Sequence, residues 1–180
     1  MLSSTRMILL APVMFSLSMT TACQPPDDLI VSAESTTTPS VSLRTFSGKF
    51  LCAENGGGGI VNANRDVASS WETFTLVDQN GGDLVDGDLI NLKALNGQYV
   101  VAENGGGGIV NASRDAASTW ETWRLHKMSG GPGAVHNGDQ IALQTFVSGL
   151  WLSAVNGGGD TVRADGPAAN VWEVFVVGSP

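Results

Sequence analysis

The sequence predicts an all-β fold built from three similar units, and three observations lead to that prediction. Residues 53–73 and 102–122 are identical at 18 of 21 positions, and residues 154–174 keep part of the same pattern. Matching tryptophans lie 49 and 52 residues apart, and matching glycines repeat both spacings. These markers are Trp71, Trp120 and Trp172, and Gly48, Gly97 and Gly149. Between the markers, apolar and polar residues alternate in short runs without a helical period, which is typical of strands.

Each unit contains four short runs that predict strands, separated by residues that favour turns. The first strands are expected at 41–44, 90–93 and 141–144, the second at 49–53 and its equivalents, the third at 60–63, 109–112 and 161–164, and the fourth at 71–77, 120–125 and 172–177. Asn-Gly pairs at 55–56, 104–105 and 156–157 suit turns with a positive φ, as do the pairs at 86–87, 96–97 and 137–138.

Units of this size cannot each bury an apolar face alone, so the three are expected to share one core. Closing the sheet on itself also removes exposed strand edges. These requirements predict a single β-trefoil over residues 41–180, with six strands in a short barrel and six in hairpins that cap one end. The expected core residues are Leu43, Leu51, Ala53, Trp71, Phe74, Leu92, Val100, Ala102, Trp120, Trp123, Leu143, Leu152, Ala154, Trp172 and Phe175.

The first 40 residues are expected to lie outside the trefoil. Residues 1–22 have a short positive start, an apolar run at 7–17 and a small polar end, which together predict a secretory signal peptide. The apolar run is shorter than the ~20 residues that a membrane-spanning helix needs. Cys23 follows a bacterial lipobox-like sequence, so it is expected to carry a lipid anchor, the alternative being simple cleavage and release. Residues 23–40 then form a Pro- and Thr-rich disordered linker, and the protein is extracytoplasmic, either a cell-envelope lipoprotein or secreted.

Charge and cysteine content exclude several kinds of partner. Seventeen acidic residues against nine basic ones give a net charge of −8 and a pI near 4.5, which argues against nucleic acid as a partner. Contact with a membrane is expected only through the lipid anchor. The two cysteines, Cys23 and Cys52, form neither a disulfide framework nor a metal-ligand spacing, and Cys52 is expected to be a small buried residue.

Motifs for catalysis are absent from the sequence. The glycine runs at 56–59 and 105–108 lack the Lys-Ser/Thr that completes a phosphate-binding loop. His126 and His136 stand apart from any nucleophile motif. We therefore expect a protein that is not an enzyme and needs no cofactor or metal.

The repeated segments resemble the fascin-like β-trefoil domain of the actin-crosslinking-like superfamily. Residues 48–55, 60–65 and 68–74 carry the resemblance, which recurs at 97–104, 109–114 and 117–123 and covers nearly all of residues 41–180. The family's eukaryotic members bundle actin through several trefoils in tandem, whereas related bacterial domains occur in secreted proteins and beside glycoside hydrolases, where carbohydrate binding is inferred. A single trefoil with an export leader implies the second kind of protein rather than an actin bundler.

The candidate binding residues are the polar groups that repeat beside the glycine turns, together with one aromatic position. They are Glu54, Asn55, Asn62 and Arg65, with Glu103, Asn104, Asn111 and Arg114 in the second unit, and the aromatic residues Phe50, Tyr99 and Trp151. Carboxylates, amides and guanidinium groups can hydrogen-bond sugar hydroxyls beside an aromatic face. The alternative is structural, with Asn needed for positive φ and Arg65 paired with Glu72. In the third unit, Val155, Arg163 and Gly166 replace Glu, Asn and Arg.

Two functions remain open at this point. The first is a non-catalytic, lectin-like module that binds a polysaccharide or glycan. The second is a protein-interaction module of the fascin type, which binds a protein surface.

Overall fold

The computed structural model describes residues 39–180. The predicted signal peptide, the lipid-anchor cysteine Cys23 and nearly all of the predicted linker therefore lie outside the described residues.

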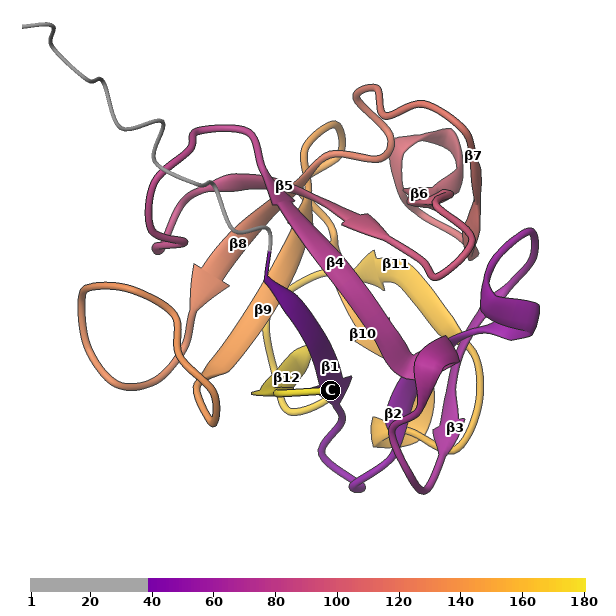
Figure 1. The fold of residues 1–180 in the computed structure, drawn as a ribbon, viewed down its shortest axis with the longest axis horizontal. Helices are drawn as coiled ribbons and strands as arrows, with labels where there is room; N and C mark the ends of the chain where they lie inside the picture. Colours follow the sequence, from indigo (N-terminus) through magenta and orange to yellow (C-terminus); the bar gives the residue numbers. More distant parts are fainter. Residues whose placement is uncertain (1–38) are drawn as a thin grey trace, which may run out of the picture. The chain divides into compact units, whose positions relative to one another are not determined.

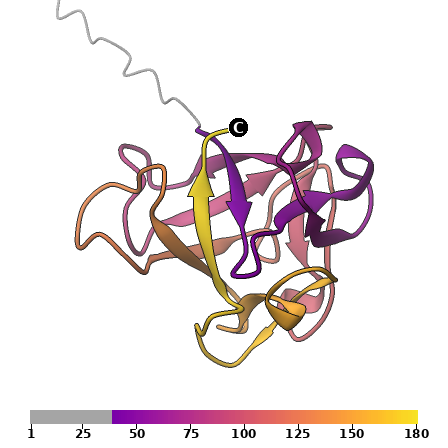
Figure 2. The same cartoon turned by 90° about the horizontal axis from the view of Figure 1, so that it is seen from below.

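Six strands close a barrel in which every neighbouring pair is antiparallel (Figure 1). They are β1 (Ser40–Arg44), β4 (Thr73–Asp78), β5 (Leu89–Lys93), β8 (Trp123–Lys127), β9 (Gln140–Thr145) and β12 (Val174–Gly178). Figure 2 shows the yellow β12 lying beside the indigo β1, and their pairing, with Leu43 opposite Val177, closes the ring. The barrel therefore has no free strand edge among the described residues, which removes a surface that could pair with the strands of other chains.

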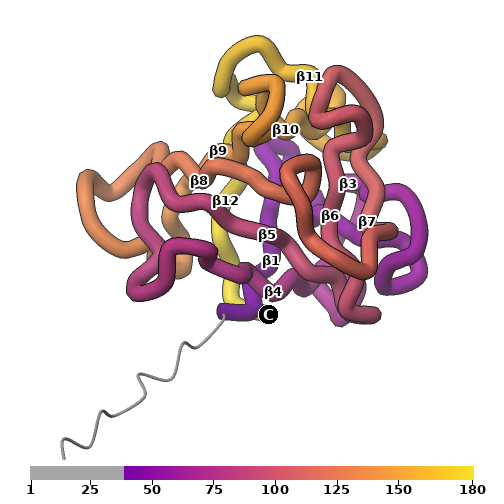
Figure 3. Tube along the Cα trace, turned by 90° about the horizontal axis from the view of Figure 1, so that it is seen from above, coloured from indigo at the N-terminus to yellow at the C-terminus, as the bar shows by residue number. Residues whose placement is uncertain are grey.

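The other six strands form one hairpin in each unit. The hairpins are β2 (Phe50–Ala53) with β3 (Val61–Arg65), β6 (Tyr99–Ala102) with β7 (Val110–Arg114), and β10 (Trp151–Ala154) with β11 (Val162–Gly166). They meet one another at one end of the barrel, as the trace in Figure 3 shows. The predicted β-trefoil of three four-strand units is therefore confirmed.

Glycine loops link the hairpins into a cycle through main-chain hydrogen bonds. Gly58 N–H in the first unit donates to Ala112 O in the second at 2.7 Å. Gly107 N–H in the second unit donates to Ala164 O in the third at 2.7 Å. The cycle is completed when Gly159 N–H donates to Ala63 O of the first unit at 2.6 Å. Each unit is thus held by both of the others.

Twelve of the predicted core residues are at most 1% exposed, so most of the predicted core is confirmed. Phe74, Trp123 and Phe175 are the largest of them and occupy matching positions at the starts of β4, β8 and β12. Alternation along these barrel strands sends one set of side chains inward, which is why the two-residue period located the core.

The prediction that the three marker tryptophans belong to the core is wrong. Trp71, Trp120 and Trp172 are 39%, 39% and 44% exposed. The residue after each tryptophan is a glutamate that turns inward, because its Oε2 accepts the backbone N–H three residues earlier, at 2.8–2.9 Å. In the first unit this turn is the one-turn 3₁₀ segment η2 (Ser70–Glu72). The fourth strands therefore begin two or three residues later than predicted, and the tryptophans face outward.

The three turn asparagines adopt the left-handed backbone that the Asn-Gly pairs predict. Asn55, Asn104 and Asn156 have φ of 60°, 59° and 60°, inside the short segments η1 (Glu54–Gly56), η3 (Glu103–Gly105) and η4 (Val155–Gly157). A residue with an ordinary Cβ pays about 1–2 kcal/mol for this conformation, while Asn and Gly tolerate it.

We expect Asn104→Ala to lower the free energy of unfolding by about 1 kcal/mol, while Asn104→Gly costs much less. Urea denaturation followed by far-ultraviolet circular dichroism measures both values. Equal losses in the two variants would show that the asparagine side chain, and not the backbone angle, is what stabilises this turn.

Candidate ligand-binding site

A carboxylate, an amide and a guanidinium meet at the base of the first hairpin. Glu54 Oε1 accepts a hydrogen bond from Asn62 Nδ2 at 2.9 Å, and Glu54 Oε2 accepts one from Arg65 Nη2 at 2.7 Å. Arg65 Nε also lies 3.6 Å from Oε1 of the buried Glu72. Arg65 therefore joins the end of β3 to η1 on one side and η2 on the other.

The second unit repeats this network with nearly the same distances. Asn111 Nδ2 donates to Glu103 Oε1 at 3.0 Å, and Arg114 Nη2 donates to Glu103 Oε2 at 2.8 Å. Arg114 Nε lies 3.8 Å from Glu121 Oε1. The structure thus brings Glu54, Asn62 and Arg65 together, and likewise their counterparts in the second unit, but not Asn55 or Asn104. It also shows the Arg65–Glu72 pairing of the structural alternative.

The network leaves some N–H groups of each guanidinium free to donate hydrogen bonds to a ligand. Arg65 has five N–H donors, of which one reaches Asn64 Oδ1 at 3.1 Å, one reaches Glu54, and one faces Glu72. The other two have no acceptor among residues 39–180, and the side chain is 37% exposed. Because Glu54 and Glu72 fix the arginine, these two donors are presented to solvent from a defined position.

Trp71 and Arg65 both line a small hollow in the surface. The hollow, of about 280 Å³, lies between the end of β3 and η2. Its lining residues are Arg65, Val67, Ser69, Ser70, Trp71 and Glu72. The indole is held at one edge by Gly56, where an added Cβ would lie 3.3 Å from Trp71 Cδ1. A fixed and partly exposed indole therefore lies beside a guanidinium and two serines.

Matching positions in the second unit have the same arrangement, but the third unit does not. Trp120 packs on Gly105 as Trp71 packs on Gly56, again with 3.3 Å between Cδ1 and an added Cβ. In the third unit Gly166 stands where the arginine would be, and a Cβ there would lie 2.9 Å from Glu173 Cγ. Glu173 thus occupies the space that a larger side chain would need. The arrangement of indole, arginine and glutamates therefore occurs in the first and second units.

The predicted aromatic face lies elsewhere. Phe50, Tyr99 and Trp151 begin β2, β6 and β10, and all three are half-buried. Lys93 Nζ lies 5.0 Å from the Tyr99 ring centroid, and the His126 ring lies 4.8 Å from that of Trp151. Two of these rings therefore already have a neighbour over or beside them. Asn55 and Asn104 serve the turns, and their exposed side chains make no hydrogen bond with residues 39–180.

Sequence reasoning missed Trp71 and Trp120 as surface residues, although one pattern could have located them. Residues 69–72 read Ser-Ser-Trp-Glu, which fits the Ser-x-x-Glu capping box. That pattern predicts a turn in which the glutamate faces its own backbone. A tryptophan directly before such a glutamate points away from it.

Within residues 39–180, no three His, Cys, Asp or Glu side chains lie close enough together to hold a metal ion. In the same part of the chain, no helix has the length and apolar character needed to cross a membrane.

Comparison with known proteins identifies the fold. A family model described as a domain of unknown function (DUF7910) matches residues 80–131. No curated protein matches the chain. Among solved structures, the designed three-fold symmetric protein ThreeFoil is similar at 20% identity and a TM-score of 0.63, covering 78% of this chain and 99% of that one.

Two natural proteins are similar in the same way. The SDF2-like protein from Arabidopsis thaliana has a TM-score of 0.62 at 14% identity, covering 77% of this chain and 91% of its own. A Caenorhabditis elegans protein of unknown function has a TM-score of 0.62 at 17% identity, covering 82% and 98%. The likeness is one of fold. It agrees with the β-trefoil seen in the strand pairing.

The β-trefoil also buries the free thiol of Cys52, confirming the sequence prediction for this residue. Burial raises its pKa from 9.0 to about 12, and the nearby carboxylates of Glu72 and Glu54 add to the shift. Above its ordinary pKa of 9.0, the thiol of the unfolded chain loses a proton that the folded chain keeps, so a rise in pH favours unfolding.

We expect the free energy of unfolding of the wild type, measured relative to that of Cys52→Ala, to fall by about 1.4 kcal/mol per pH unit between pH ~9 and ~11. Urea denaturation of both proteins at a series of pH values measures this difference. A difference that stays constant with pH would mean that the thiol ionises equally easily in both states.

Proposed function

We propose that this protein is a non-catalytic carbohydrate-binding module with two equivalent sites, at Trp71 and at Trp120. The observation that carries the proposal is the hollow in which a fixed, partly exposed indole lies beside an arginine with two unused N–H donors. The same arrangement of indole, arginine and glutamates recurs in the second unit.

The chemistry of a sugar ring suits such a hollow. A pyranose has an apolar face of C–H groups and a rim of hydroxyls, so it needs an apolar surface with hydrogen-bonding groups at its edge. Indole supplies a large rigid surface, and guanidinium and hydroxyl groups supply donors and acceptors. Arg65 contributes donors only, while Ser69 and Ser70 contribute both. The hollow is shallow and small, which favours weak binding of one or two sugar units.

Two weak sites on one molecule can act together on a polymer. Once one site is occupied, the second meets its ligand at a high effective concentration, and binding is strengthened without new contacts. A polysaccharide with repeated units is therefore the favoured ligand. The fascin-like sequence resemblance fits this proposal. The predicted export leader, with the predicted lipid on Cys23, would also put the module where such polymers occur.

A protein-interaction module is the second candidate, and a different observation favours it. Leu95, Val147 and Phe46 are 60%, 52% and 73% exposed. Each lies next to the turn glycine on which one of the marker tryptophans packs. Exposed apolar residues that gather at matching places can mark a protein contact. Co-sedimentation with actin filaments tests the fascin-type version of this candidate directly.

Retention of the full-length protein on a panel of insoluble polysaccharides, together with a glycan array, tests the proposed function. Binding should change the intrinsic tryptophan fluorescence, because Trp71 and Trp120 would leave water. Specific retention of a protein that unfolds cooperatively supports the proposal. Failure on every polysaccharide, combined with pelleting by a protein partner, would favour the second candidate.

A further inference from the structure

A cleft of about 500 Å³ opens at the end of the barrel away from the hairpins. Barrel residues at the start of β1 and the ends of β4 and β12 form its walls, among them Val41, Leu76 and Val177. Leu84 and Val135, from the loops 79–88 and 128–139, complete its apolar lining. The cleft is separate from the hollow at Trp71, with which it shares no lining residue.

The origin of the cleft lies in the topology. The two loops that join consecutive units are themselves joined, since Val135 N–H donates to Leu84 O at 2.7 Å, and each loop places an apolar side chain against the core. β12 and β1 are the last and first strands, so within residues 39–180 no third loop connects them. The three-fold pattern is therefore broken at this end of the barrel, and the cleft lies beside the β12–β1 pair.

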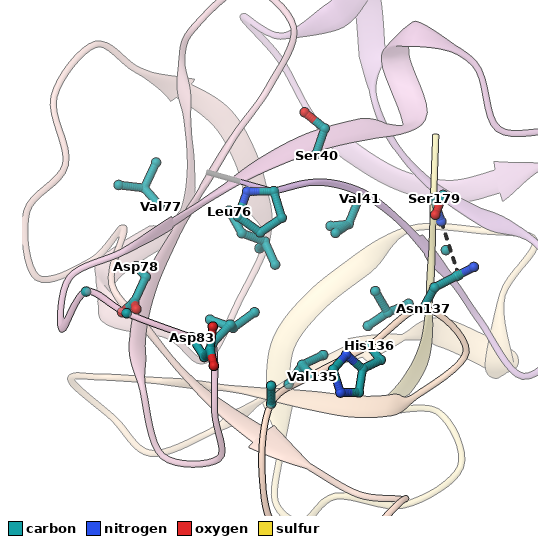
Figure 4. Close-up of a pocket in the computed structure, with 17 residues that line it drawn as sticks. Ser40, Val41, Leu76, Val77, Asp78, Asp83, Val135, His136, Asn137 and Ser179 are labelled. Atoms are coloured by element: carbon teal, nitrogen blue, oxygen red, sulfur yellow. Dashed lines mark hydrogen bonds between the residues drawn. The ribbon is translucent and has the colours of Figure 1, made fainter. Parts of the chain in front are cut away.

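Polar groups at the cleft carry negative charge. Figure 4 shows Asp78 and Asp83 on one side of the cleft and His136 and Asn137 on the other. Neither a lysine nor an arginine is among the residues that line it. The amide oxygen of Asn137 already accepts the Ser179 N–H at 3.2 Å. The two carboxylates are thus the strongest electrostatic feature of the cleft.

Asp78 is the carboxylate with unmet hydrogen-bonding capacity. Its Oδ1 accepts the Asn80 N–H at 2.8 Å, but its buried Oδ2 has no partner among the described residues. A buried acceptor without a donor is unfavourable, and a charged donor that reaches this carboxylate gains a charge-assisted hydrogen bond. Asp78 is among the residues that line the cleft, so a cation bound there would meet a carboxylate whose hydrogen-bonding capacity is not fully used.

We propose that this cleft binds a small organic cation, an amine with an apolar body. The ammonium group donates to the carboxylate of Asp78, Asp83 adds attraction at the entrance, and the apolar body packs against Leu76, Leu84 and Val135. The volume lies within the range of about 300–1,000 Å³ that is common for small-molecule sites. A carboxylate ligand is disfavoured because it would meet two like charges.

Three probes that share one skeleton test the proposal on the full-length protein: benzylamine, benzyl alcohol and benzoate. Binding is measured at neutral pH by chemical-shift changes of backbone amides in titrations. We expect benzylammonium to shift amides around Leu84 and Val135 and to bind about tenfold more tightly than the alcohol, while benzoate leaves them unshifted. Equal shifts with all three probes, or amine shifts confined to other regions, would overturn the proposal.

Variants decide whether the carboxylates are responsible. Asp78→Asn should weaken benzylammonium binding about tenfold. Asp83→Asn, at an exposed loop position where folding is not at risk, should weaken it less. Asp115→Asn is the matched control, because it removes the same charge from an exposed site at the hairpin end. Equal weakening in all three variants would indicate general charge screening and contradict a specific site. Sugar binding at Trp71 is measured separately, so each proposal can fail alone.

Discussion

Replacing Trp123 by alanine is expected to lower the free energy of unfolding by about 3–5 kcal/mol. The side chain is fully buried at the start of β8, and its Nε1 donates to Val100 O at 3.3 Å. Truncation leaves a large cavity in a core shared by all three units and removes the hydrogen bond to Val100 O on β6. Urea denaturation followed by far-ultraviolet circular dichroism measures the loss without relying on tryptophan fluorescence.

Trp120, only three residues earlier, is the matched control for this experiment. It is 39% exposed and packs against Gly105, so Trp120→Ala is expected to cost about 1 kcal/mol or less. Equal losses in the two variants would mean that the marker tryptophans support the core after all. They would then be poor candidates for a ligand surface.

Replacing Trp71 and Trp120 together by alanine is expected to abolish retention on the polysaccharide that the wild type binds. Each single change removes the apolar wall of one hollow and should weaken binding about tenfold or more, because the two sites reinforce each other on a polymer. The double variant should stay folded, since both indoles lie outside the core. Affinity electrophoresis in gels that contain the polysaccharide measures the graded loss.

The third unit supplies the control for this loss. Trp172 is 44% exposed and packs on Gly157, like its two counterparts, but its unit lacks the Glu–Arg pair. Trp172→Ala should therefore leave retention unchanged. Unchanged retention in the folded Trp71/Trp120 double variant would place the ligand elsewhere. A comparable loss in all three single variants would instead favour a surface that uses every exposed indole, as in the protein-interaction candidate.

Much of the fold could be predicted because the sequence contains three related repeats of one pattern. Repetition fixed the number of units, Asn-Gly pairs located the turns, and two-residue alternation located Phe74, Trp123 and Phe175 in the core. The marker tryptophans were misplaced because a large aromatic residue at a repeated position suggests burial. Their orientation depends on the following glutamate, whose hydrogen bond to the backbone decides which side chain turns inward.

The candidate site was predictable only in part. Repetition grouped Glu54, Asn62 and Arg65, but whether they bind one another or a ligand depends on distances that residue types do not reveal. The cleft at the barrel end has no counterpart in any motif. It arises from the way two loops and a strand pair come together, which only the folded chain shows.

The main-chain hydrogen bonds between the glycine loops and the neighbouring hairpins give the third unit a structural role. Gly159 N–H reaches Ala63 O of the first unit, and Gly107 N–H reaches Ala164 O of the third. Removing the third unit would therefore break main-chain hydrogen bonds with both of the units that carry the proposed sites. The third unit can therefore lack the Glu–Arg pair without harm to the fold, whereas a change in its glycine loop or core is expected to weaken the cooperative unfolding of all three units.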